Sequence, residues 1–290
     1  MRIRNCMPLA RLLRVCRFMS VFRGWDKLLR ICFHPDRQPE TVLEFPFVGV
    51  RYPGSTAYLV DWSAFFYGAY EKQWLEFCLS HLSNPGAAQV LDIGGNVGHH
   101  ALWFAAHGCK VDSFEPNPAL WPEIETKAGV KGLKGSITLH GTAMGAVDET
   151  RSFNLPSGTN QGTGSFEHEP YNWDGEKAEI RISAASDYIA SLGIERADLV
   201  KIDVEGFEID VMEGLKKFLA TSRPVLWVEV SADAPGRRID LPKLKSYLSG
   251  EYRYFLARAV SPLLTTQKFV QTDNIPDGPA VDVIAVPVTA

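Results

Sequence analysis

Val90-Leu91-Asp92-Ile93-Gly94-Gly95-Asn96-Val97-Gly98 decides the fold, because an apolar run leads directly into a glycine-rich turn. The run predicts a buried strand over 89–93, and the turn predicts a helix that begins near residue 98. Glycine lets the backbone approach a ligand where a Cβ would collide, and the first N–H groups of the helix point at the same place. The stretch therefore predicts a nucleotide-cofactor site, although its glycine order differs from the G-x-G-x-x-G of dinucleotide-binding proteins.

A second strand, predicted over 110–114, ends at Glu115 and is followed by Pro116. In doubly wound sheets an acidic residue roughly 20 residues beyond the glycine loop binds the two hydroxyls of a ribose. A ribose clamp without a pyrophosphate loop indicates an adenosyl ligand that lacks phosphates. S-adenosylmethionine fits this description.

Strand and helix patterns alternate along most of the chain, which predicts an α/β fold with a doubly wound, mostly parallel sheet. Asn84-Pro85-Gly86 marks the expected boundary between an N-terminal segment, 1–84, and the main domain, 85–290. The N-terminal segment is expected to hold a helix over 8–22, two short strands within 42–62 and one helix over 62–82. The remaining expected strands are 136–140, 151–155, 179–182, 198–203, 224–230, 253–257 and 281–287, and the expected helices are 98–107, 118–128, 186–192, 207–219 and 241–249.

Charge and cysteine content exclude some functions. The 290 residues carry a net charge of −4, which argues against a nucleic-acid partner. Residues 1–37 alone carry +7, so the remainder carries −11. The five cysteines form no C-x-x-C pair, which favours a reducing compartment, the cytoplasm, over a disulfide framework or a zinc site.

The predicted helix over 8–22 is amphipathic, with Arg11, Arg14 and Arg17 around an apolar stripe. Such a helix packs on a main domain in most proteins, and this is the favoured interpretation. A basic amphipathic helix can instead lie on an anionic membrane or dock a partner enzyme. Residues 1–37 are therefore a candidate contact with a membrane or a partner.

Four motifs together resemble the FkbM family of S-adenosylmethionine-dependent methyltransferases, within the class I Rossmann-like methyltransferases. They are the glycine-loop motif 90–98, Phe114-Glu115-Pro116-Asn117-Pro118, Val200-Lys201-Ile202-Asp203-Val204-Glu205-Gly206-Phe207-Glu208, and Pro224-Val225-Leu226-Trp227-Val228-Glu229. The resemblance covers roughly residues 85–235, and Gly95 replaces the alanine that the family shows more often. It implies a methyltransferase, and it leaves the acceptor open.

In this interpretation Asp92 lies near the methionine amino group, while Glu115 accepts from the ribose hydroxyls. Asn96 bonds either its own loop or the ligand's carboxylate, and Met144 is either an adenine neighbour or core. The expected cofactor-binding residues are Asp92, Gly94, Gly95, Asn96, Gly98, Glu115, Pro116, Thr142, Ala143 and Asp203.

The acids near the ends of two later strands are the candidate catalytic groups: Asp203, Glu205 and Glu229. Methyl transfer from a sulfonium mainly requires alignment of the acceptor oxygen and removal of its proton, for which a carboxylate is a suitable base. The same carboxylates match the oxygen preference of Mg²⁺ or Ca²⁺, but no further ligand is identifiable, so metal-free catalysis is favoured. Glu208 either caps its helix or takes part in this group. His99 and His100, at the start of the predicted helix over 98–107, are interpreted as packing or capping residues.

The polar, glycine-rich tract 156–177 is expected to border the acceptor, with Asn160 and Ser165 as candidate contacts. We expect an O-methyltransferase that acts on a hydroxyl of a glycan, a glycolipid or a secondary metabolite. One alternative is a non-catalytic scaffold that binds a partner through its basic N-terminus. The other is an NAD-dependent oxidoreductase, which the missing pyrophosphate motif disfavours.

Overall fold

The computed structural model describes residues 2–3, 6–38, 40–156, 164–166, 174–230, 239–261, 264–276 and 281–288. Its centre is an eight-stranded sheet in the order β12-β11-β13-β10-β9-β3-β4-β5. The strands are β3 (Gln89–Ile93), β4 (Lys110–Phe114), β5 (Ser136–His140), β9 (Leu199–Ile202), β10 (Val225–Val230), β11 (Tyr252–Ala259), β12 (Gln267–Gln271) and β13 (Val281–Pro287). The strands from β10 to β5 are parallel, and β13, β11 and β12 extend the sheet antiparallel. The expected α/β fold is confirmed.

The strand order reverses between β3 and β9. From β3 the chain moves outward through β4 to β5, whereas from β9 it moves the opposite way to β10. Open α/β sheets bind ligands at such a point, beyond the carboxyl ends of the strands. The loops after β3 and β9 are therefore the place to look for the site.

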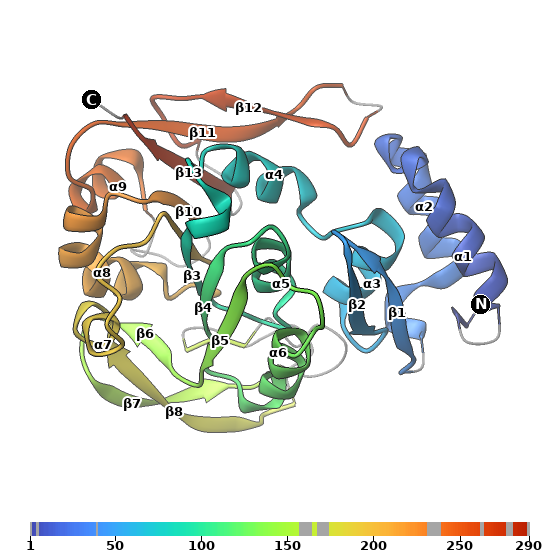
Figure 1. The fold of residues 1–290 in the computed structure, drawn as a ribbon, viewed down its shortest axis with the longest axis horizontal. Helices are drawn as coiled ribbons and strands as arrows, with labels where there is room; N and C mark the ends of the chain where they lie inside the picture. The colour runs from blue at the N-terminus through green and yellow to red at the C-terminus, as the bar shows by residue number, and fades with distance from the viewer. Residues whose placement is uncertain are drawn as a thin grey trace.

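Helices cover both faces of this sheet, with α5 and α6 on one side and α7, α8 and α9 on the other (Figure 1). The helices of the main domain are α5 (His99–Ala106), α6 (Trp121–Ala128), α7 (Ala185–Ser191), α8 (Glu208–Ser222) and α9 (Leu241–Tyr247). Val90 and Leu91 belong to different buried clusters, and so do Leu199 and Val200. Because successive side chains point to opposite faces, a strand buried on both sides is apolar at most of its positions.

A smaller sheet lies beside α8 and has the order β6-β8-β7. It consists of β6 (Ala143–Gly145), β7 (Glu149–Asn154) and β8 (Lys177–Ala184). The strands expected near 151–155 and 179–182 belong to it. Of the polar tract, residues 157–163 and 167–173, which include the candidate Asn160, lie outside the described residues.

The N-terminal segment packs against the helix that follows the glycine loop. It comprises α1 (Met7–Val15), α2 (Arg23–Phe33), the hairpin β1 (Val42–Phe47) and β2 (Val50–Ser55), α3 (Leu59–Tyr67) and α4 (Lys72–Ser80). Short 3-10 helices lie at Cys16–Val21, Pro35–Arg37, Pro85–Ala87 and Pro118–Leu120. Ala10, Leu29 and Phe33 are fully buried in the cluster that also contains Leu102 of α5. The inner side of the basic segment is thus part of the core.

Two expectations for this segment are corrected. The single helix over 62–82 is two helices, because Gly68 adopts a φ of 93° and ends α3. Glycine adopts this left-handed conformation without the steric cost of a Cβ. The helix over 8–22 ends at Val15 and continues as a 3-10 helix. Helix α2 and strands β6 and β12 were not expected from the sequence.

Substitution of Phe33 tests how much the packing of the N-terminal segment contributes to stability. Its side chain is fully buried, and its carbonyl accepts a hydrogen bond of 3.0 Å from the Trp62 indole. We expect Phe33→Ala to lower the free energy of unfolding by about 3–5 kcal/mol, because it leaves a cavity in the core. Ile31→Ala on the same helix, where the side chain is 79% exposed, is the matched control and should change it little. Equal denaturant midpoints for both variants would contradict the packing.

Candidate active site

The loop after β3 makes its tight turn against the loop after β9. Gly94, Asn96 and Gly98 all have positive φ, at 85°, 49° and 74°. A Cβ placed on Gly94 would overlap the backbone carbonyl oxygen of Asp203. The glycine is therefore needed for the two loops to meet at the point where the sheet reverses.

Glu115 follows directly after β4 and links the glycine loop after β3 to the loop after β4. Its side chain is 5% exposed and accepts hydrogen bonds from the backbone N–H groups of Asn96 (2.7 Å) and Asn117 (2.8 Å). Burial raises the pKa of Glu115 to about 7 despite these two bonds. Each carboxylate oxygen has a second lone pair, so the group can accept two further hydrogen bonds from a ligand in the pocket.

Lys201 places a buried cation between β3 and β9. Its ammonium lies 3.1 Å from Asp203, 3.7 Å from Asp92 and 3.4 Å from the Gly94 carbonyl oxygen. Burial alone would raise the pKa of Asp203, but the ammonium beside it holds that pKa below its usual range. Asp203 is consequently ionised at neutral pH.

The other carboxyl groups around Lys201 and Asp203 have raised pKa values. Burial and the neighbouring Asp203 raise the pKa of Glu71 to about 8, of Glu205 to about 7 and of Glu229 to about 9. Burial, followed by Glu71, raises the pKa of Asp282 to about 7. At neutral pH Glu229 therefore keeps its proton, while Glu205 and Asp282 are near their midpoints.

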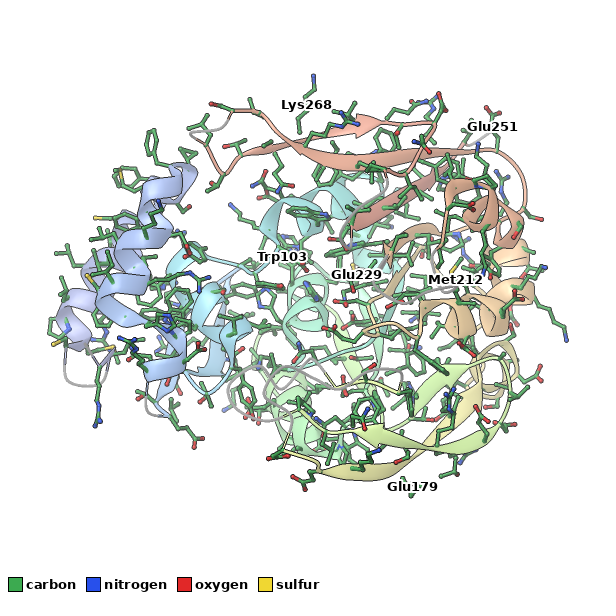
Figure 2. All side chains as sticks on the ribbon, turned by 180° about the vertical axis from the view of Figure 1, so that it is seen from behind. Trp103, Glu179, Met212, Glu229, Glu251 and Lys268 are labelled. Atoms are coloured by element: carbon green, nitrogen blue, oxygen red, sulfur yellow. The ribbon has the colours of Figure 1, made fainter. Side chains whose placement is uncertain are left out.

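These groups line one pocket. Glu229, on its wall, lies near the middle of the molecule (Figure 2). Of the predicted site residues, the lining includes Gly94, Gly95, Asn96, Glu115, Pro116, Ala143, Asp203, Glu205 and Glu229. Asp92, Gly98 and Thr142 lie behind it. Asp92 faces Lys201, Gly98 packs against Ile124, and the Thr142 hydroxyl bonds Ser183 at 2.9 Å.

The smaller sheet and residues 164–166 border one side of the pocket. Met144 and Phe153 line it there, together with Gly164 and Phe166. Ser165 is fully buried and its hydroxyl donates to the Glu205 carbonyl oxygen at 2.8 Å. Its hydroxyl thus holds the Glu205 backbone, which has a φ of 52°. A non-glycine residue in this conformation is strained, as residues at functional sites often are.

The N-terminal segment supplies residues that sequence reasoning missed. Tyr70 and Glu71, in the turn before α4, line the pocket beside His99 and His100 of α5. Glu71 Oε2 lies 3.0 Å from His100 Nε2. Because burial lowers the pKa of His100 to about 4, its imidazole is neutral at neutral pH.

A buried polar chain holds His99 in place behind this wall. The Tyr70 N–H donates to His99 Nε2 at 3.0 Å, so His99 Nδ1 carries the proton and faces the Tyr52 hydroxyl at 3.0 Å. Tyr52 in turn donates to Asp61 at 2.6 Å, and Lys127 lies 3.5 Å from the same carboxylate. The interpretation of the two histidines as packing residues is thus incomplete, because both also face the pocket.

The sequence analysis gave Lys201 and Asp282 no role in the site, although the sequence contains a feature that points to them. Each is a charged residue within a strand that is otherwise apolar. Such a residue is buried only with a partner, so it marks a polar site inside the core. Glu208, the first residue of α8, accepts from the Gly206 N–H at 3.0 Å and so holds the turn that leads into the helix. Among the described residues, no three His, Cys, Asp or Glu side chains are grouped to hold a metal ion.

A wide groove of about 960 Å³ meets the pocket at Glu71, which lines both. Its wall includes the rings of Trp74, Phe77 and Phe269, with Phe77 and Phe269 stacked at 4.1 Å. Within the described chain, the buried Trp74 indole nitrogen and Gln267 Oε1 have no hydrogen-bond partner. The groove thus offers ring faces, with Gln73 and Thr266 also on its wall.

Known proteins resemble the part of the chain that forms this pocket. Residues 92–259 match the profile of the "Methyltransferase FkbM domain" family. "Methyltransferase 1" of Beauveria bassiana is 22% identical over 164 residues, covering 50% of this chain and 66% of that protein. "Hexuronic acid methyltransferase AglP" of Haloferax volcanii is 27% identical over 162 residues, covering 53% of this chain and 60% of that protein. The chain thus spans about two thirds or less of the length of these relatives.

A solved structure, methyltransferase FkbM from Methylobacillus flagellatus KT, is similar with a TM-score of 0.43 and 15% identity. The match covers 69% of this chain and 44% of that one. The family profile spans more than half of the chain and confirms the resemblance seen in its motifs. The chain belongs to the FkbM family of S-adenosylmethionine-dependent methyltransferases.

Proposed function

We propose that the pocket binds S-adenosylmethionine and that the protein transfers its methyl group to a hydroxyl of a saccharide. The charges of the lining residues support the cofactor. Six carboxyl groups and one ammonium line the pocket within the described residues. Asp203 is ionised, and Glu205 and Asp282 titrate near 7. Their negative charge suits a ligand that carries a sulfonium and an ammonium, and Glu115 is positioned to bind ribose hydroxyls. When bound, the cofactor supplies an electrophilic methyl group.

Glu205 is the proposed general base, and its raised pKa is the observation that carries this assignment. A base works best when its pKa is near the working pH, and the pKa of Glu205 is about 7. Asp203 is occupied by Lys201, and Glu229 is protonated and hydrogen-bonded to Asp203. Glu205 would accept the proton of the acceptor O–H, and the sulfonium of the bound cofactor would supply the methyl group and leave as the neutral thioether. No metal ion is needed for this step.

The groove that meets the pocket at Glu71 is the proposed acceptor site. Aromatic faces with nearby donors and acceptors suit sugar rings, which present C–H surfaces and hydroxyls. Exposed Arg17 and Lys72 also line the groove. Lys72 lies 3.3 Å from Glu76 of the same wall, so Arg17 is the groove cation proposed to meet the carboxylate of an acidic sugar. The relative from Haloferax volcanii, which is named for hexuronic acid, supports the same substrate class. A glycolipid or a secondary-metabolite alcohol is the alternative acceptor.

The cofactor is tested by isothermal titration of the full chain with S-adenosylhomocysteine and with NAD. We expect heat of binding with the sulfur compound and none with NAD. Methyl transfer from labelled S-adenosylmethionine to a glucuronic acid glycoside, a neutral glucoside and a macrolide alcohol then tests the acceptor class. Binding without transfer to any sugar would contradict the saccharide proposal and leave the cofactor assignment standing.

Glu115→Ala should weaken S-adenosylhomocysteine binding by roughly 10²–10⁴-fold. Two hydrogen bonds to a charged acceptor, about 1.5–3 kcal/mol each, are lost together. Glu125→Ala, at an exposed position on α6, is the matched control. Because Glu115 also accepts two backbone N–H groups, the melting temperature without ligand is measured alongside. A dissociation constant close to that of the wild type would contradict the ribose assignment.

The pH dependence of methyl transfer should follow Glu205. A general base acts when deprotonated, so kcat/KM is expected to rise with pH through about 7 and to level off above it. Glu205→Gln should remove this rise and lower the rate about 10²–10⁴-fold, with cofactor binding largely retained. Glu179→Gln, at an exposed position on β8, is the control. If Glu205→Gln keeps both the rate and the pH profile, the base lies elsewhere.

A further inference from the structure

The N-terminal helices carry large apolar side chains that are exposed among the described residues. Seven of the twelve large hydrophobic side chains found exposed among the described residues fall within 12–31. We call them the outer apolar face: Leu12 (58% exposed), Val15 (73%), Phe18 (72%), Val21 (36%), Phe22 (49%), Leu28 (42%) and Ile31 (79%). Exposed apolar groups that gather in one part of a surface mark an interaction site, whereas single ones are ordinary.

The position of this face is set by the buried side of the same helices. On α2, Leu29 and Phe33 are fully buried while Leu28 and Ile31 point outward. Leu12, Val15, Phe18 and Val21 follow one another at intervals of three, and in the 3-10 segment Cys16–Val21 residues at this interval eclipse one another. Backbone hydrogen bonding of Thr265 to Val21 at 2.8 Å ties this segment to the chain before β12. This bond and the buried side chains of α2 fix the orientation of the outer apolar face relative to the described core.

The charge around the outer apolar face indicates what covers it. Arg11, Arg17 and Lys27 are exposed on the same segment, and residues 1–37 carry +7 on a remainder of −11. Two copies of the chain joined face to face would bring +7 against +7, which disfavours a symmetric dimer here. An apolar strip flanked by basic residues is instead the pattern of helices that lie in the interface of an anionic membrane. No helix in the described parts of the chain is long and apolar enough to cross a membrane.

We propose that the outer apolar face binds the surface of an anionic lipid bilayer. Helices α1 and α2 lie together at one end of the molecule, which leaves their exposed side chains at its outer surface (Figure 1). Leu12, Val15 and Ile31 enter the acyl boundary, while the basic side chains contact anionic headgroups. Phe18 and Val21 belong both to this face and to the wall of the groove at Glu71. Membrane binding thus brings the groove close to the lipid surface, where an acceptor anchored in the membrane would be found.

Co-sedimentation of the full chain with vesicles tests this proposal, without cofactor or acceptor in the sample. Vesicles of phosphatidylcholine with 30% phosphatidylserine are compared with phosphatidylcholine alone. Each exposed basic residue near an anionic surface strengthens binding by about fivefold, so three should favour the anionic vesicles by on the order of 100-fold. High salt should reduce this difference.

Leu12→Glu/Val15→Glu/Ile31→Glu should reduce binding to the anionic vesicles at least about tenfold, because each change removes apolar burial and adds a negative charge. Val147→Glu/Val260→Glu is the control, since these valines are also exposed (57% and 58%) but lie elsewhere. S-adenosylhomocysteine binding is measured for every variant, which separates this result from the proposed methyl transfer.

Equal binding to both vesicle types, or unchanged binding of the triple variant, would overturn the proposal. Self-association that the triple variant abolishes, with no vesicle binding by the wild type, would overturn it in favour of an interface between copies.

Discussion

The buried ammonium of Lys201 is the interaction on which the rest of the site depends. It lies between the loops after β3 and β9, in contact with Asp92, Asp203 and the Gly94 carbonyl. A cation buried in this way is tolerated only with charged or hydrogen-bonding partners, and removal of one partner leaves an uncompensated charge. The ends of β3 and β9 are thus held together in two ways. Lys201 contacts charged or polar groups of both, and Gly94 lies close to the Asp203 carbonyl.

This single cation cannot neutralise all the acids around it. Asp203 takes the direct contact and stays ionised, so the neighbouring carboxyl groups meet both burial and a fixed negative charge. Their pKa values are raised in consequence, to about 7 for Glu205 and about 9 for Glu229. Neighbouring groups of one chemical type can therefore take different protonation states at one pH, and this allows a general base and a proton donor to coexist in the same pocket.

The N-terminal segment is coupled to the pocket through packing and through one polar chain. Phe33 and Leu29 join the cluster that contains α5, while Tyr52, Asp61 and the Tyr70 backbone hold His99. The same segment brings Glu71 to the wall shared by the pocket and the groove. Its inner side is thus structural, and its outer apolar face is free to serve another contact.

The sequence by itself determined the α/β fold, most strands of the central sheet and the family, because these depend on local patterns. Strands buried on both faces are apolar runs, and the loop from Gly94 to Gly98 needs glycines at set positions. Glu115 was found because it follows directly after such a strand. Only the tertiary structure brought Glu71, Lys201 and Asp282 together, since they come from distant parts of the chain and no spacing links them. It also separated the protonation states of Asp203 and Glu205, because these depend on which carboxyl group contacts the buried ammonium of Lys201.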